Sequence, residues 1–178
     1  PLCGLVQGNR DPTPGGLRAT RPGIQASGHI TVIVIGGAGY VGSMVVELLL
    51  ARGHQVRVHD SLLFGDKALA SFRDHPKFAL TVGDIRDLTS VLPLVKDADA
   101  VILTAAIVGE KACDANPAET EAVNLFAPSA IAEACKYYHV DRFVFASTDS
   151  VYGIQEGIIT EDAELKAVSF YARLKVLM

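Results

Sequence analysis

The sequence predicts an α/β protein with a doubly wound parallel sheet. Three observations support this class: apolar segments rich in Val and Ile recur along the chain, helical stretches separate them, and glycine or polar residues follow them. Continuous apolar runs are typical of parallel strands buried on both faces, and regular alternation with helices is typical of crossovers between parallel neighbours. The expected strands span residues 31–35, 55–59, 77–82, 100–106 and 142–146.

The first expected strand runs directly into a turn with three glycines, Gly36, Gly39 and Gly42. Gly36 can make the tight turn off the strand, Gly39 lets the backbone approach a pyrophosphate, and Gly42 lets the next helix pack closely. A helix over residues 41–52, ended by Gly53, would direct free N–H groups and its positive dipole end at a phosphate. The turn indicates a dinucleotide site, although a glycine cluster alone also marks ordinary turns.

Asp60 stands at the tip of the second expected strand, about 20 residues past the glycines. A carboxylate there can accept hydrogen bonds from the ribose hydroxyls of adenosine, and it would repel a 2′-phosphate. The spacing therefore predicts NAD rather than NADP as the cofactor. The alternative, Asp60 as a turn residue before Ser61, leaves the whole spacing to chance.

The middle of the chain continues the alternation of helices and strands. A short helix is expected over Lys67–Arg73, and the third strand, Lys77–Val82, closes on a glycine. Asp87 can cap a helix over Leu88–Lys96, in which Pro93 fits poorly because it lacks an N–H group.

From residue 100 onward, the sequence predicts a strand over Ala100–Ala106 and a long helix from Asn116 to Tyr138. Asn116 followed by proline is typical of a helix start. Pro128 lies in the middle of this helix and should kink it. After the fifth strand, Thr160 is the expected cap in a polar loop that leads to a final helix over Val168–Met178.

Composition limits the classes of function that remain open. The 178 residues are 49% hydrophobic and carry a net charge of −4 without a basic run, which argues against a nucleic acid partner. No apolar stretch approaches the ~20 residues that span a bilayer, so we expect a soluble protein without membrane contact. Cys3, Cys113 and Cys135 lie at no metal-like spacing, so we expect reduced thiols in a cytoplasmic protein and no metal site.

Residues 1–28 differ in kind from the rest of the chain. They hold six Gly and four Pro, begin at Pro1 without an initiator Met, and show no apolar periodicity. Such a stretch cannot bury enough apolar surface to offset the entropy lost on ordering. We therefore expect a flexible tail over residues 1–28 and a cofactor-binding domain over residues 29–178.

Tyr171 and Lys175 are four residues apart in the last helical stretch, so they lie on the same helix face. A lysine ammonium near a phenol favours the phenolate and lowers the tyrosine pKa from about 10. Such a tyrosine can remove a proton from a hydroxyl while a nicotinamide accepts a hydride. Thr148, or alternatively Ser147, could supply a hydroxyl at the tip of the fifth strand. The plainer alternatives are a surface lysine, a half-buried tyrosine and hydroxyls that cap the strand end.

Together these motifs resemble the extended short-chain dehydrogenase/reductase family, in particular its NAD-dependent nucleotide-sugar epimerases and dehydratases. The resemblance covers about residues 31–175 and implies a Rossmann-type fold that binds NAD. The segments that carry it are Gly36–Gly42, Asp60, Gly83–Asp87, Ala105–Ala106, Asn124, Val151–Gly153 and the pair Tyr171 and Lys175.

The resemblance also implies roles at the cofactor. Asp84 and Ile85 would flank the adenine, and Asn124 would reach the cofactor from the long helix. Lys175 would hold the nicotinamide ribose. The full set of expected cofactor-binding residues is Gly36, Gly39, Tyr40, Val41, Gly42, Asp60, Asp84, Ile85, Thr104, Ala105, Ala106, Asn124 and Lys175.

The implied catalytic residues are Thr148 as the active-site hydroxyl, Tyr171 as the base and Lys175, which would tune Tyr171. Similar sugar 4,6-dehydratases carry Thr-Asp-Glu before Val-Tyr-Gly, whereas this chain has Ser150 at the third position, which cannot act as the elimination base. The resemblance therefore favours an epimerase of a nucleotide sugar. A 4-keto reductase or a decarboxylase stays open.

Enzymes of this family continue past the Tyr/Lys helix into a C-terminal domain that binds the nucleotide sugar, whereas this sequence stops at Met178. The resemblance therefore implies an N-terminal fragment or a natural truncation without the substrate domain. The competing hypothesis is an NAD-binding or interaction module without catalysis. A homodimer through the helices Asn116–Tyr138 and Val168–Met178 is a further expectation.

Overall fold

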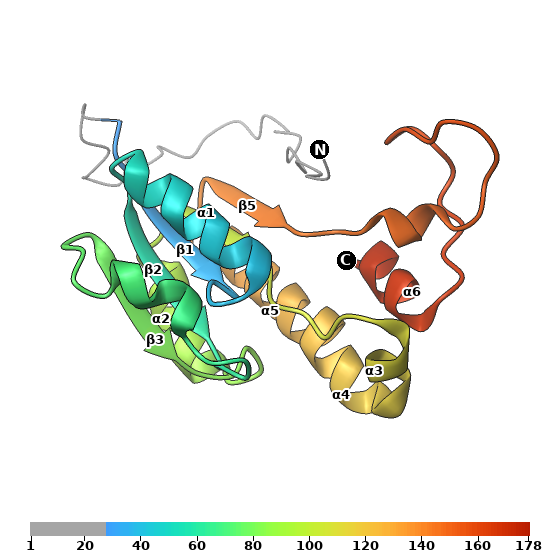
Figure 1. The fold of residues 1–178 in the computed structure, drawn as a ribbon, viewed down its shortest axis with the longest axis horizontal. Helices are drawn as coiled ribbons and strands as arrows, with labels where there is room; N and C mark the ends of the chain where they lie inside the picture. The colour runs from blue at the N-terminus through green and yellow to red at the C-terminus, as the bar shows by residue number, and fades with distance from the viewer. Residues whose placement is uncertain (1–27) are drawn as a thin grey trace, which may run out of the picture.

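The computed structural model describes residues 28–178, which form a five-stranded parallel sheet of order β3-β2-β1-β4-β5 (Figure 1). The predicted doubly wound α/β class is confirmed. The described residues do not include positions 1–27, which hold Cys3 and all of the predicted tail except Gly28. The strands are β1 (Thr31–Ile35), β2 (Gln55–Asp60), β3 (Phe78–Val82), β4 (Ala100–Leu103) and β5 (Arg142–Phe145).

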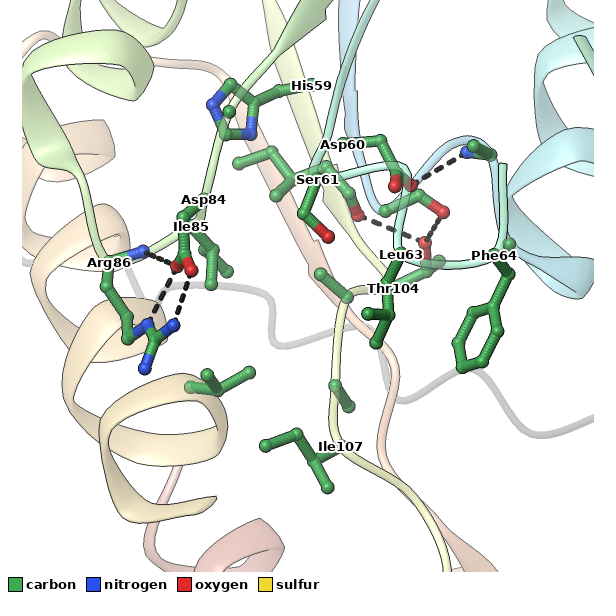
Figure 2. Close-up of a pocket in the computed structure, with 18 of the residues that line it drawn as sticks. His59, Asp60, Ser61, Leu63, Phe64, Asp84, Ile85, Arg86, Thr104 and Ile107 are labelled. Carbon is green, nitrogen blue, oxygen red and sulfur yellow. Dashed lines mark hydrogen bonds and ion pairs between the residues drawn. The ribbon is translucent and has the colours of Figure 1, made fainter. Parts of the chain in front are cut away.

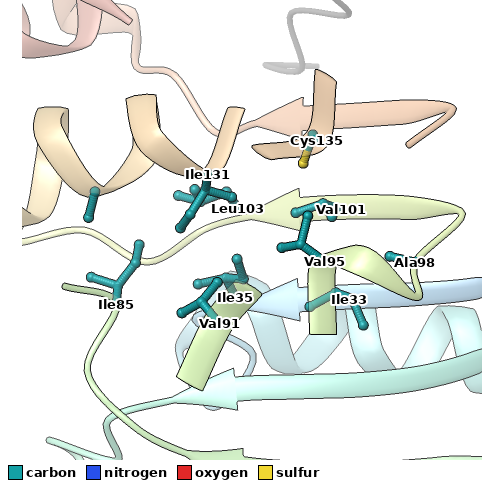
Figure 3. Packing of buried hydrophobic residues seen from close by; sticks show 11 residues of the cluster. Ile33, Ile35, Ile85, Val91, Val95, Ala98, Val101, Leu103, Ile131 and Cys135 are labelled. Carbon is teal, nitrogen blue, oxygen red and sulfur yellow. The ribbon is translucent and has the colours of Figure 1, made fainter. Parts of the chain in front are cut away.

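Two apolar clusters cover the two faces of this sheet. On one face, α1 (Tyr40–Ala51) and the 3-10 helix η1 (Lys67–Phe72) pack on Val32 and Val34 of β1. On the other face, α2 (Leu88–Lys96) and α5 (Ala127–Tyr137) pack on Ile33 and Ile35 (Figure 3). Alternate residues of β1 thus enter different cores, which explains why the whole strand is apolar.

Helix α1 ends as the sequence predicted, at a glycine in the left-handed region. Gly53 has φ +78°, its N–H donates to Leu50 O at 2.8 Å, and the His54 N–H donates to Leu49 O at 3.1 Å. These two bonds form a Schellman motif, which satisfies the last carbonyl groups of the helix.

Strand β4 is shorter than predicted, because it ends at Leu103 rather than at Ala106. The N–H groups of Thr104 and Ala105 both donate to Ile35 O, at 2.8 and 3.0 Å. Since one carbonyl of β1 accepts hydrogen bonds from two successive residues, the regular pairing of β1 with β4 ends there and the chain leaves the sheet. A short helix that the sequence analysis did not foresee, α3 (Glu110–Ala115), follows this segment.

The long helix expected over residues 116–138 is three segments in the structure: α4 (Pro117–Glu121), a π-helical turn η2 (Ala122–Phe126) and α5. Asn116 caps its start as predicted, because Asn116 Oδ1 accepts the Glu119 N–H at 3.2 Å. Pro128, the predicted site of a kink, is the second residue of α5. It lies in the first turn of α5, directly after the π turn, and the wider turn accommodates a residue that has no N–H to donate.

Thr160 caps no helix, so that expectation was wrong. The last helix, α6 (Phe170–Leu177), begins later than predicted and is capped by Ser169, whose Oγ accepts the Ala172 N–H at 3.2 Å. Thr160 lies in the irregular segment between the 3-10 helix η3 (Asp149–Tyr152) and α6. Asp87 does cap α2, because its Oδ1 accepts the Thr89 N–H at 3.0 Å.

The glycine turn gives a first testable prediction. A Cβ atom on Gly42 would lie 2.1 Å from Gly36 O, whereas a Cβ on Gly39 would meet the same oxygen at 3.3 Å. Gly42→Ala should therefore lower the free energy of unfolding by about 2 kcal/mol or more, because backbone has to move. Gly39→Ala is the matched control and should cost clearly less, about 1 kcal/mol, because Gly39 is the N-cap of α1, where alanine is disfavoured. Urea denaturation measures both, and equal losses would contradict the packing described.

Candidate functional site

A cavity of about 710 Å³ opens at the carboxyl ends of the strands (Figure 2). Its wall comes from the glycine turn after β1, the ends of β2 and β3, and the segment that follows β4. Ligands of open α/β sheets bind at this edge. The expected cofactor residues that line it are Gly36, Gly39, Asp60, Asp84, Ile85, Thr104, Ala105 and Ala106.

The first turn of α1 lies beside this cavity and contains three further expected residues, Tyr40, Val41 and Gly42. They do not line the cavity itself. No side chain caps the helix, and its first turn contains no acidic residue. The positive end of the helix dipole is therefore not neutralised locally, as an anion site requires.

The Asp60 carboxylate is held by two backbone amides. Its Oδ2 accepts the Ala38 N–H of the glycine turn at 2.9 Å, and its Oδ1 accepts the Leu62 N–H at 2.8 Å. Each carboxylate oxygen keeps a second lone pair, so Asp60 can still accept hydrogen bonds from a ligand. The structure thus fixes a negative charge on the cavity wall next to the glycine turn.

Thr104 ties the end of β4 to the glycine turn. Its Oγ1 lies 3.0 Å from Ile35 O and 3.1 Å from Gly36 O, and the hydroxyl can donate to either. A Cβ on Gly36, whose φ is +87°, would lie 2.4 Å from the Ala105 nitrogen. Only glycine allows the turn after β1 and the segment after β4 to come this close, and their separation sets the width of the cavity at this point.

Arg86 and Glu119 belong to the cavity wall, and the sequence analysis assigned them no role. Arg86 Nε donates to Asp84 Oδ1 at 2.9 Å and Nη2 to Oδ2 at 2.5 Å, while Nη1 donates to Glu119 Oε1 at 3.1 Å. This fork holds the pKa of Asp84 below its usual range, mainly through the hydrogen bond. The spacing of Asp84 and Arg86 could have signalled the first contact, but Glu119 comes from α4 and no local pattern reveals it.

His59 is a second wall residue without a predicted role. It lies on β2 next to Asp60, is completely buried, and contacts Ser90 of α2, with Nε2 and Oγ 2.9 Å apart. Burial lowers the pKa of His59. The sequence analysis placed His59 in the second expected strand, but the strand pattern gave no signal for a buried polar residue at the cavity wall.

Asn124, expected at the cofactor, lies behind the cavity wall. Its side chain is fully buried in the π turn, and it binds the backbone of Ile107 twice at 2.8 Å: Oδ1 accepts the N–H and Nδ2 donates to the carbonyl. Cys113 Sγ also lies 3.4 Å from Ile107 O. Asn124 therefore fixes the segment after β4, which does line the cavity.

Tyr171 and Lys175 lie on one face of α6, with Lys175 Nζ 5.7 Å from the centroid of the Tyr171 ring. Lys175 is 5% exposed, its Nζ donates to Ala146 O at 2.9 Å, and it lies 4.2 Å from the Phe145 ring centroid. Burial lowers the pKa of Lys175 to about 8. Burial also raises the pKa of Tyr171, so the expected lowering by Lys175 was wrong for this structure, because desolvation dominates.

Thr148 caps the helix η3, with its Oγ1 accepting the Ser150 N–H at 3.2 Å. It lies 3.3 Å from Asp149 Oδ1. In the described part of the chain no hydrogen bond joins Thr148 to Tyr171, and neither residue lines the cavity. Eight of the expected cofactor residues thus line the cavity, whereas Thr148, Tyr171 and Lys175 lie outside its wall.

The remaining thiols and charged groups form no metal centre in the part that the structure describes. Cys113 and Cys135 are buried free cysteines, and burial raises the pKa of Cys135 to about 11. Among residues 28–178, no cluster of three or more His, Cys, Asp or Glu side chains could hold a metal ion. No helix within this range has the length and apolar character needed to cross a membrane.

Comparison with known proteins gives a consistent family. The model of the NAD dependent epimerase/dehydratase family matches residues 32–178. The chain is 36% identical over 151 residues to the low-salt glycan biosynthesis protein Agl12 of Haloferax volcanii, covering 81% of this chain and 48% of that protein. It is 33% identical to the UDP-glucose 4-epimerase of Lactobacillus helveticus, covering 83% of this chain and 44% of that enzyme.

A solved structure agrees with these relatives. The UDP-glucose 4-epimerase of Thermus thermophilus, crystallised with NAD, has a TM-score of 0.73 and 34% identity. The match covers 82% of this chain and 47% of the enzyme. The chain therefore spans less than half the length of each of these three proteins.

The burial of Lys175 gives a second prediction, on the pH dependence of stability. Below about pH 8 the folded chain holds Lys175 as a buried ammonium. Between pH 8 and 10.5 Lys175 loses its proton in the folded chain, where its pKa is about 8, but keeps it in the unfolded chain, where the pKa is 10.5. Stability should therefore rise with pH across this window. The free energy of unfolding of the native chain, relative to Lys175→Met, should increase by about 3 kcal/mol from pH 7 to pH 10.5.

Denaturant unfolding at several pH values measures this difference. Lys136→Met is the matched control, because Lys136 is 79% exposed on α5 and its removal should give a difference that does not change with pH. If the difference in free energy of unfolding between the native chain and Lys175→Met does not change with pH, the Lys175 ammonium is solvated in the folded chain.

Proposed function

Because this chain belongs to the NAD-dependent epimerase/dehydratase family, we propose that it binds NAD(H) and forms the cofactor domain of a nucleotide-sugar epimerase. The observation that carries the proposal is the Asp60 carboxylate, fixed by two backbone amides on the wall of a cavity that begins at the glycine turn. An acidic group at this place suits the ribose hydroxyls of NAD and disfavours NADP.

The residues present fit a dinucleotide. Gly39 and the uncapped first turn of α1, with Tyr40 and Val41, would hold the pyrophosphate. Asp60 would accept hydrogen bonds from the ribose, and the cavity continues past it to Asp84 and Ile85, where the adenine would lie. A volume of about 710 Å³ is within the range of small-molecule sites.

NAD, when bound, supplies the hydride acceptor for oxidation of a sugar carbon. The proposed contribution of this chain is Tyr171 as the acceptor of the sugar hydroxyl proton. Only the phenolate can accept it, so the phenolic proton of Tyr171, which its raised pKa retains at neutral pH in the structure described, must first pass to solvent. The Lys175 ammonium would stabilise a phenolate once the hydroxyl has lost its proton. Thr148 would orient the reacting oxygen of the substrate.

The choice of an epimerase rests on the relatives and on Ser150. The relatives include UDP-glucose 4-epimerases, and Ser150 stands where an elimination in the related dehydratases would need an acid. These enzymes extend well beyond the matched part, so we propose that turnover of a nucleotide sugar requires a second half like theirs. A 4-keto reductase or dehydratase is the nearest alternative within the family.

A second candidate is a module that binds NAD, or a protein partner, without turnover. One observation favours it: Thr148, Tyr171 and Lys175 lie outside the cavity wall. The Lys175 ammonium also donates a hydrogen bond to Ala146 O. The homodimer through the helices Asn116–Tyr138 and Val168–Met178 stays a prediction.

Cofactor preference is the third testable prediction. The chain should bind NAD at least about tenfold more tightly than NADP, because Asp60 would meet a 2′-phosphate with like charge. Asp60→Asn keeps the shape of the side chain, and it should weaken NAD binding and remove the preference. Asp141→Asn is the control, since Asp141 comes directly before β5, at the other edge of the sheet. Calorimetric titration with both cofactors measures this, and equal or tighter NADP binding by the native chain would refute it.

Turnover is the fourth prediction and separates the two candidates. The 178-residue chain should bind NAD but show negligible epimerisation of UDP-glucose, because alignment of the reacting atoms depends on binding energy from the rest of the substrate. A version extended by a substrate domain should epimerise a nucleotide sugar and lose activity by about 10²-fold or more on Tyr171→Phe. Robust turnover by the chain alone would contradict the need for a second half. NAD binding without turnover in any extended form would favour the module.

A further inference from the structure

The segment between η3 and α6, residues 153–168, projects from the domain as an arm (Figure 1). Two of its isoleucines are almost completely exposed, Ile154 at 94% and Ile158 at 97%. Three further apolar side chains of the arm are also exposed: Ile159, Leu165 and Val168. Single exposed apolar residues are ordinary on a protein surface, whereas several in one short segment are typical of an interaction surface.

The arm is held closed at its base by three hydrogen bonds. The Lys166 N–H donates to Val151 O at 2.9 Å, and Gln155 Nε2 donates to Tyr152 O and to Glu164 O, both at 2.8 Å. These bonds keep the two limbs of the arm side by side. The exposed side chains therefore belong to a preformed structure, which lowers the entropy cost of binding a partner.

The arm is acidic as well as apolar. Its sequence contains four acidic residues, all exposed, and a single cationic one: Glu156, Glu161, Asp162 and Glu164 against Lys166. The Lys166 ammonium lies 3.1 Å from Glu164 Oε2, so the other three carboxylates keep the arm negative. A matching surface would be apolar with Lys or Arg at its rim, whereas a second copy of the arm would bring like charges together.

The two ends of the arm lie at the expected catalytic residues. Its first end follows η3, which Thr148 caps, and its second end precedes Ser169, which caps α6 just before Tyr171. Helices η3 and α6 also pack against each other. A protein surface that docks on the arm therefore comes beside Thr148 and Tyr171, where the proposed reaction needs the sugar.

We propose that the arm is the docking surface for the half of the enzyme that holds the nucleotide sugar. This inference rests on the proposed function. The relatives have the length for such a half, because the matched part is only 44% of the Lactobacillus helveticus enzyme and 47% of the Thermus thermophilus enzyme. The partner face is apolar with a basic rim. It covers Ile154 and Ile158 and pairs with the carboxylates around them.

The test compares the 178-residue chain with the same chain extended by the second half of the Lactobacillus helveticus enzyme. Amide hydrogen exchange in the arm should be about tenfold or more slower in the extended form. Ile154→Asp combined with Ile158→Asp should restore fast exchange and lower turnover about tenfold or more. NAD affinity should stay within about twofold, since neither residue lines the cavity. Met44→Asp combined with Leu48→Asp, on the exposed face of α1, is the matched control and should change neither exchange nor turnover.

Equal exchange in the arm of the two forms would overturn the docking surface. A second measurement needs no extended form: a dimer of the 178-residue chain that Ile158→Asp dissociates in sedimentation velocity would make a second copy the occupant, and would also overturn the proposal. If the chain still binds NAD in either case, the proposed function stands. Absence of NAD binding would overturn the proposed function, whatever the exchange in the arm.

Discussion

The site depends on the close approach of three backbone segments around Gly36. The Gly36 N–H donates to His59 O at 2.8 Å, which joins the turn to β2, and the segment after β4 comes so near that no Cβ fits on Gly36. Gly42 of α1 packs on the Gly36 carbonyl from the other side. Because these contacts involve backbone, any side chain added at either glycine would push apart the strand ends that form the cavity. One residue thus sets the positions of β2, β4 and α1.

Desolvation, rather than ion pairing, controls the charged groups near α6. The Lys175 ammonium lies in a buried site with a carbonyl and an aromatic ring as partners, and its pKa falls to about 8. The same burial raises the pKa of Tyr171. The cofactor wall behaves differently, because strong donors hold both carboxylates: the amides of Ala38 and Leu62 bind Asp60, and the Arg86 fork binds Asp84. The structure therefore keeps fixed negative charge at the cavity, whereas the positive charge of Lys175 is buried and is lost above about pH 8.

The sequence predicted the fold well because its signals are local. The apolar strands, the glycine spacing of the first turn, the Asn116 and Asp87 caps and the acid at the end of β2 all follow from short patterns. The predicted end of β4 was wrong because the two residues after the strand donate to the same acceptor, Ile35 O, which is far away in the sequence. Asn124, Arg86 and His59 show the same limit for the site. Their partners Ile107, Glu119 and Ser90 lie between 17 and 33 residues away, so only the fold brings them together.

The most direct test of the cofactor site is the amide NMR spectrum of the isotopically labelled chain during titration with NAD. The account predicts that the largest chemical-shift changes fall on the glycine turn from Gly36 to Gly42, on Asp60 and on Gly83 to Arg86, with little change on the amino-terminal side of the sheet. Shifts that instead gather on the shallow depression between Leu92 of α2 and Tyr138, after α5, would contradict it, as would a spectrum that NAD leaves unchanged.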